Sequence, residues 1–168
     1  MKTKLSPLVE ELLALPAANS LAPKRNPDAA LLARLNALTL DTLFASHKIE
    51  SRSDAECVRS ALLLWHDFLD ESHTISQAIE TQNGSYWHGI MHRREPDYGN
   101  AKYWFRKVGQ HAIFPTLGKD WDPCAFIDQC EQAAKTKDAK LDEHCRAVQK
   151  AEFDLLLEHC WMKAIGKN

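Results

Sequence analysis

Apolar residues recur along most of the chain at the three- and four-residue spacing of helices that bury one face. Ala101, Trp104, Phe105 and Val108 are one example, at positions i, i+3, i+4 and i+7. No segment shows the sustained alternation of apolar and polar residues, bounded by turn residues, that a strand needs. The pattern therefore predicts an all-α protein, a single-domain multi-helix bundle of about eight or nine helices with helical-hairpin stacking in the middle.

Prolines after capping residues mark the start of several helices. Pro7, Pro27 and Pro123 follow Ser, Asn and Asp, and proline suits the first helical position because its missing N–H would have no partner there. The helices expected outside the middle of the chain span about 7–13, 27–38, 41–47, 123–134 and 138–165.

Turn and capping signals also divide the middle of the chain. Ser53-Asp-Ala-Glu56 has the spacing of a capping box and predicts a helix that ends near residue 68 or 69. We place a turn at Asp70, another at Asn83-Gly84 before a helix capped by Ser85, and a third at Asp97-Tyr-Gly99. The helices expected here span about 54–69, 71–79, 86–95 and 100–108, and the residues through Pro115 and Gly118 form a loop.

The length and composition are those of one ordinary globular domain. At 168 residues, with 45% hydrophobic and 26% charged residues, the chain can bury about 70% of its unfolded surface without help from a metal or disulfide. We treat residues 1–168 as a single helical domain, with a site-bearing segment at 65–111 and C-terminal helices at 123–165. The formal net charge of −2 argues against nucleic acid or an anionic membrane as a partner.

The N-terminus and the cysteines bear on location. Lys2 and Lys4 precede an apolar stretch as in a signal peptide, but Glu10 and Glu11 interrupt it. All strictly apolar runs fall far short of the about 18 residues of a membrane-spanning helix. Five cysteines without CxxC spacing argue against a disulfide framework and a zinc ribbon, so we expect reduced, buried, structural thiols. The chain is therefore expected to be soluble and cytoplasmic.

One helical face in the site-bearing segment could hold a divalent metal ion such as Zn, Mn, Fe or Ni. His88, His92 and Glu95 lie at i, i+4 and i+7, which places two imidazoles and a carboxylate on one side of a helix. His66 and His73 from the preceding hairpin could complete the set. In the simpler alternative these histidines are partly buried and hydrogen-bonded, and Glu95 pairs with a neighbouring arginine.

The same segment offers groups for a small acidic ligand. Arginine supplies planar, bidentate donors, and aromatic rings can stack on a ligand. The candidate ligand-binding residues are Arg93, Arg94, Arg106, Trp87, Tyr103 and Asp70. In the alternative, the acidic stretch 65–75 and the basic stretch 92–107 form salt bridges with each other between neighbouring hairpins.

The sequence leaves two classes of function open. The glycine-rich phosphate loops and the G-x-S-x-G nucleophile motif are absent. A metal site would favour metal-assisted hydrolysis, in which the metal activates water. The competing hypothesis is a non-catalytic helical-hairpin module that binds another protein through an aromatic patch of Trp87, Tyr98 and Trp104. The oligomeric state is left open.

The stretch Ser85-Tyr-Trp-His-Gly-Ile-Met-His-Arg-Arg-Glu-Pro-Asp-Tyr-Gly-Asn-Ala-Lys-Tyr-Trp-Phe-Arg-Lys-Val-Gly109 resembles a segment of an uncharacterised family of small helical proteins from bacteria and fungi. The resemblance extends upstream through Asp70-Glu-Ser-His73 and downstream through Trp121-Asp-Pro123. It implies a family identity and a helical fold. It implies no activity, cofactor or catalytic residue.

Overall fold

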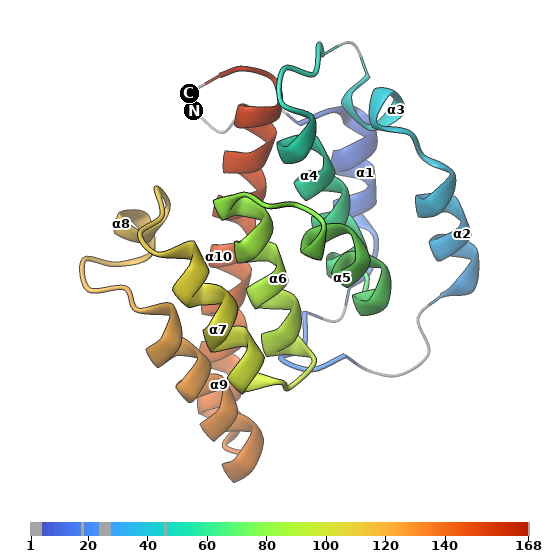
Figure 1. The fold of residues 1–168 in the computed structure, drawn as a ribbon. Helices are drawn as coiled ribbons and strands as arrows, with labels where there is room; N and C mark the ends of the chain where they lie inside the picture. Colours follow the sequence, from blue (N-terminus) through green and yellow to red (C-terminus); the bar gives the residue numbers. More distant parts are fainter. Residues whose placement is uncertain (1–4, 18, 24–27, 46, 168) are drawn as a thin grey trace.

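Helices make up the regular structure of the chain, as Figure 1 shows. The computed structural model describes residues 5–17, 19–23, 28–45 and 47–167, and within these ranges it contains ten helices and no strand. This confirms the all-α prediction. The helices are α1 (Pro7–Ala14), α2 (Ala29–Ala37), α3 (Leu40–Phe44), α4 (Arg52–Trp65), α5 (Leu69–Gln77), α6 (Gln82–Arg94), α7 (Tyr98–Val108), α8 (Phe114–Leu117), α9 (Pro123–Thr136) and α10 (Ala139–Ala164).

Six of the described helices pack in a closed circuit. Helix α4 contacts α5, α5 contacts α6, α6 contacts α7, α7 contacts α9, α9 contacts α10, and α10 contacts α4. Helix α6 also contacts α4, and in Figure 1 it lies between α5 and α7. Consecutive helices thus stack as hairpins in the middle of the chain, while α1 and α3 cover α4 from the N-terminal side.

Helix α6 has no face toward solvent. Every residue from Asn83 to Arg94 is buried, although the helix carries two histidines and two arginines. Gly89 allows α7 to approach closely, because a Cβ atom at this position would lie 2.8 Å from the Phe105 ring. The polar side chains of α6 must therefore find partners inside the protein.

Large aromatic side chains join α10 to the rest of the core. Trp161 stacks on Phe44 with ring centroids 4.4 Å apart, and Trp87 meets Phe153 edge to face at 5.0 Å. Trp87 and Trp161 are fully buried. The position of α6 is therefore fixed by a packed apolar core on its α10 side.

Two helices of the middle segment begin earlier than the sequence suggested. The turn predicted at Asn83-Gly84 is wrong, because both residues lie in α6 and the Thr81 side chain caps it by accepting from the Gly84 N–H at 3.1 Å. Gly84 is needed for close packing, since a Cβ atom would overlap the Ile79 carbonyl oxygen. Helix α4 likewise begins after Ser51, whose hydroxyl caps Asp54, and not after Ser53.

Other predicted boundaries also move. The turn after α4 lies at Asp67, which has a positive φ of 65°, so Asp70 lies inside α5 and not in a turn. Helix α7 begins at Tyr98 with Asp97 as its cap, which corrects the predicted turn at 97–99. A single helical turn, α8, occupies part of the predicted loop at 109–121.

At the ends of the chain the capping signals agree better with the structure. Asp122-Pro123 opens α9, Asp138 caps α10, and Ser6-Pro7 opens α1, as predicted. The predicted start of a helix at residues 26 and 27 lies outside the described residues, and Asp28 caps α2. None of the helices in the described ranges is both long and apolar enough to cross a bilayer.

Candidate metal centre

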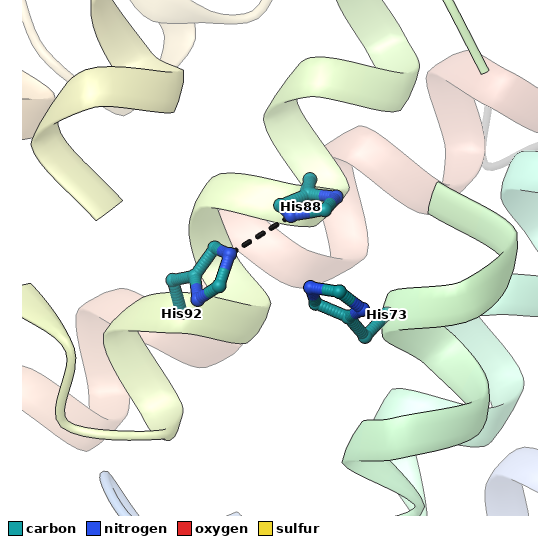
Figure 2. A group of neighbouring side chains, drawn as sticks. All are labelled: His73, His88 and His92. Carbon is teal, nitrogen blue, oxygen red and sulfur yellow. Dashed lines mark hydrogen bonds between the residues drawn. The ribbon is translucent and has the colours of Figure 1, made fainter. Parts of the chain in front are cut away.

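Three histidines from two helices converge. His73 projects from α5, and His88 and His92 project from successive turns of α6 (Figure 2). One ring nitrogen from each lies within 4.8 Å of one from each of the others. His88 and His92 are buried, while His73 is partly exposed, so the cluster reaches the surface on the α5 side.

The other two predicted metal ligands lie differently. His66 stands apart from the cluster, and its Nε2 is 3.0 Å from the Leu12 carbonyl oxygen. Glu95 caps the end of α6, and its Oε2 is 3.0 Å from His92 Nδ1. Glu95 is thus placed to orient His92, and it does not form the expected pair with a neighbouring arginine.

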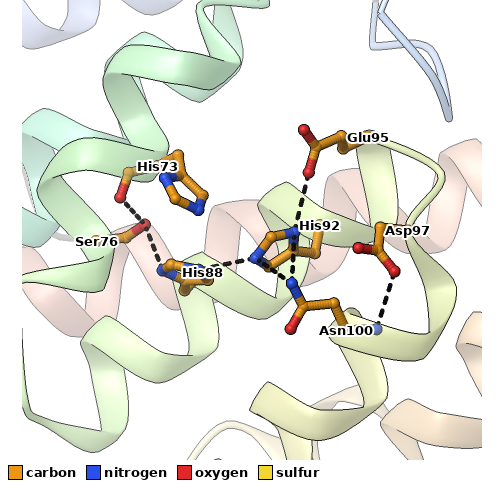
Figure 3. Close-up of polar contacts among 7 residues, drawn as sticks. All are labelled: His73, Ser76, His88, His92, Glu95, Asp97 and Asn100. Atoms are coloured by element: carbon orange, nitrogen blue, oxygen red, sulfur yellow. Dashed lines mark hydrogen bonds and ion pairs between the residues drawn. The ribbon is translucent and has the colours of Figure 1, made fainter.

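The ring nitrogens that face away from the cluster have oxygen partners. His88 Nδ1 lies 3.3 Å from Ser76 Oγ, and the Ser76 hydroxyl itself donates to the His73 carbonyl oxygen (Figure 3). The Glu95 carboxylate accepts an N–H from His92 Nδ1, and the Ser76 hydroxyl can either donate to His88 Nδ1 or accept from it. Metal-binding histidines in proteins have such outer partners, which fix the tautomer and the ring orientation.

The inner nitrogens of His88 and His92 form a hydrogen bond in the structure. His88 Nε2 and His92 Nε2 face each other at 2.8 Å, and because His92 Nδ1 donates to Glu95, His92 Nε2 is the acceptor. A metal ion that bound both nitrogens would take the place of the proton on His88 Nε2. Asn100 Nδ2 approaches His92 Nε2 at 3.0 Å, and rotation of that amide by half a turn would bring its oxygen to the same place.

Burial keeps these imidazoles neutral. Burial is the main cause that lowers the pKa of His88 to about 3, and the neighbouring His92, His73 and Lys107 contribute to the same shift. Burial also lowers the pKa of His92, although the Glu95 carboxylate opposes this shift. Neutral imidazole is the form that binds metal, so at neutral pH the site does not have to lose protons to do so.

Trp104, which the sequence placed in the core stripe, forms a wall of the cluster. Its ring lies over His88 with centroids 4.1 Å apart, and the Lys107 ammonium lies 4.1 Å from the centroid on Trp104. A surface hollow of about 380 Å³, lined by Gln82, Trp104 and Lys107 among others, lies against this wall. The cluster is thus bounded by an aromatic ring on the α7 side.

The arginines predicted to bind an acidic ligand are engaged inside the protein. Arg93 is 1% exposed and forms an ion pair with Glu152 at 2.5 Å. Arg94 pairs with Asp67 and donates to the Leu64 carbonyl oxygen. The Arg94–Asp67 pair joins α6 to the turn after α4, as expected from the opposite charges of these stretches.

The remaining ligand-binding candidates do not form a common site with Arg93 and Arg94. Arg106, Tyr103 and Asp70 are exposed, whereas Trp87 is fully buried and donates from Nε1 to Cys160 Sγ at 3.4 Å. The predicted acidic-ligand patch is therefore not assembled, because its members lie partly inside the protein and partly on its surface. An aromatic docking patch that includes Trp87 is not assembled either, for the same reason.

The chain was also compared with known proteins, and no protein-family model, curated protein or solved structure matches it. The resemblance of residues 85–109 to a helical family therefore stays a prediction. Ser76 and Asn100 were missed from the sequence, and Trp104 was expected in the core stripe and in an aromatic docking patch but not beside the histidines. Ser76 could have been noticed, since it lies three residues after His73 on the same face of a helix.

Proposed function

We propose that the protein binds one divalent transition-metal ion through His73, His88 and His92. The observation that carries the proposal is the pair of inner Nε2 atoms at 2.8 Å, whose outer nitrogens already have oxygen partners. His73 adds a third imidazole within 4.8 Å. A metal ion placed among the three nitrogens would replace the proton between His88 and His92, and His88 would then carry its proton on Nδ1, beside Ser76 Oγ.

The ligand chemistry suggests both the ion and the reaction class. Imidazole suits Zn, Fe and Ni better than it suits Mn, which prefers oxygen ligands. Three histidines leave a fourth position for water or for the Asn100 side chain, and such a metal ion lowers the pKa of a bound water, as in metal-dependent hydrolases. Within this proposal, Glu95 orients His92, and the partly exposed Trp104 covers His88 on the α7 side.

The decisive experiment measures metal binding by the full chain without a histidine tag. The protein is stripped with chelator, and Zn²⁺ binding is followed by calorimetry. We expect His73→Ala and His92→Ala each to bind one zinc ion fewer than the wild type. His144→Ala is the matched control, since His144 is exposed on α10, and it should bind as many zinc ions as the wild type.

Thermal unfolding gives a second readout of the same site. An ion that binds only the folded state stabilises it by about 2.7 kcal/mol at 100 times its Kd. Zinc should therefore raise the Tm of the wild type and of His144→Ala, and chelator should reverse the rise. A folded wild-type protein that binds no zinc, or equal binding by all variants, would refute the proposal and leave a proton shared between His88 and His92.

The cysteines bear on where the protein is located in the cell. All five cysteines are free in the structure, as they are in a reducing compartment, so we propose the cytoplasm. We still expect no nucleic-acid partner, because the formal net charge of the chain is −2.

A further inference from the structure

A second cluster of metal-ligating groups joins α4 to α10, away from the three histidines. Asp54 and Cys57 lie in α4 and Cys160 lies in α10, and one ligand atom from each lies within 4.8 Å of the others. Both cysteines are completely buried, and Asp54 is partly exposed. The two helices pack directly against each other.

The carboxylate of this cluster is held in place by neutral groups. Asp54 Oδ2 accepts from the Ser51 hydroxyl at 2.6 Å, and Oδ1 accepts from the Asn83 amide at 2.6 Å. Asn83 is fixed in turn by His111, whose Nε2 lies 2.8 Å from Asn83 Oδ1. Among the described residues Asp54 forms no ion pair with lysine or arginine, and the nearby imidazole of His159 is kept neutral because burial lowers its pKa.

The sulfur of Cys160 also has an outer-shell donor. The buried Trp87 donates from Nε1 to Cys160 Sγ at 3.4 Å. A hydrogen bond to sulfur stabilises a thiolate more than a thiol, and donors of this kind are typical of the surroundings of metal-bound cysteine. Each ligand except Cys57 therefore has an orienting partner, as in metal sites that bind tightly.

The other buried cysteine pair of the described chain lacks these features. Cys130 of α9 and Cys145 of α10 also adjoin each other, and their charged neighbours are Arg93, which is paired with Glu152, and Asp142. Among the described residues no third ligand atom lies within 4.8 Å of both of these sulfurs, whereas Asp54 supplies one for Cys57 and Cys160. The comparison singles out the cluster of Asp54, Cys57 and Cys160.

We propose that Asp54, Cys57 and Cys160 bind one thiophilic divalent cation, of which Zn²⁺ is the biological example, at a site that links α4 to α10. On binding, each cysteine S–H loses its proton to solvent, two sulfur–metal bonds form, and one carboxylate oxygen completes three ligands. Water occupies the remaining tetrahedral position. Sulfur ligands distinguish this site from the three-histidine site, and neither site depends on the other.

Cadmium alone is the probe, because its bonds to thiolate give an ultraviolet charge-transfer band that bonds to imidazole do not. The reduced, metal-free full chain is titrated with Cd²⁺. We expect a saturable band that disappears in Cys57→Ser and Cys160→Ser and that, in His73→Ala, saturates at one equivalent. The matched control is the double variant of Cys130→Ser and Cys145→Ser, which removes a buried pair of the same kind and should keep the band.

A measurement on the wild type guards against variants that fail to fold. Cysteine alkylation is followed by mass spectrometry in mild denaturant, with and without cadmium. At 100 times the Kd, cadmium should slow alkylation of Cys57 and Cys160 about 100-fold and leave that of the partly exposed Cys124 unchanged. Absence of the band in folded protein, a band that depends on Cys130 and Cys145, or equal alkylation rates would each overturn the proposal. If cadmium gives the expected band but no zinc binds at the three histidines, only the proposed function is overturned.

Discussion

Neutralising Glu152 should destabilise the protein strongly, because this carboxylate balances a buried arginine. Glu152 is 0% exposed and Arg93 is 1% exposed, and their nearest oxygen and nitrogen are 2.5 Å apart. Tyr86 also donates to Glu152, at 3.0 Å. Among the described groups, Arg93 Nε and Nη1 have no hydrogen-bond partner, so Glu152 is the only acidic side chain paired with this guanidinium.

The magnitude follows from leaving one charge of the pair behind. Breaking a buried ion pair by removing one partner costs about 3–5 kcal/mol, since the other charge stays in a low-dielectric interior. We expect Glu152→Gln to lower the free energy of unfolding by that amount. Replacing both charges by apolar residues of similar volume is often neutral, so the double variant of Arg93→Met and Glu152→Leu should be more stable than Glu152→Gln.

Urea unfolding at pH 7, followed by tryptophan fluorescence, measures these differences. The control is Asp154→Asn, which breaks the exposed pair of Lys150 and Asp154 on α10 and should cost less than about 1 kcal/mol. A loss of less than about 1 kcal/mol in Glu152→Gln, or a double variant less stable than the single one, would show that the pair is not the buried, mutually dependent unit described above.

Two further predictions concern α6 and its neighbours. Gly89→Ala should lower the free energy of unfolding by about 1–3 kcal/mol, because the new Cβ atom would lie 2.8 Å from the Phe105 ring. A urea unfolding curve that coincides with that of the wild type would contradict this packing. Burial is the main cause that lowers the pKa of His88 to about 3 and that of His111 to about 4, from 6.5. Below pH 6.5 these two histidines therefore become protonated in the unfolded state but stay neutral in the folded state. The free energy of unfolding is therefore highest above pH 6.5 and falls as the pH drops toward 4. Because both histidines are partly screened by solvent, we take half of the full linkage effect, which gives a loss of about 2–3 kcal/mol for the two groups at pH 4.5. His111→Gln should show a shallower decline in urea unfolding between these pH values, and a parallel decline would argue against His111 as a source.

The fold class could be predicted from the sequence because it depends on local signals. Asp122-Pro123 and Asp138 start α9 and α10 where their capping chemistry indicates. The same rules failed at Asn83-Gly84, a common turn pair, because tertiary contact decides there: Gly84 is required by the close approach to Ile79, and Thr81 takes over the cap. Local chemistry alone does not distinguish a glycine in a turn from one at a packed contact.

The candidate site could be predicted only as far as one helix determines it. The spacing of His88 and His92 places them on one face of any helix, and the structure keeps them there. Whether His73 or His66 joins them depends on how α5 and α4 dock, which spacing does not encode. Arg93 was predicted to bind a ligand for a similar reason. The local sequence does not show that Glu152, which lies far along the chain, pairs with it inside the protein.

The contrast between α5 and α6 bears on the kinetics of any ion at the three histidines. His88 and His92 belong to a helix enclosed on all sides, whose displacement would require the whole core to open. His73 stands on a nine-residue helix with partly exposed positions, and such a segment opens at a lower free energy than the core does. The residence time of a bound ion would therefore be set by local opening of α5, and substitutions that loosen α5 would speed its exchange without altering the two histidines beneath.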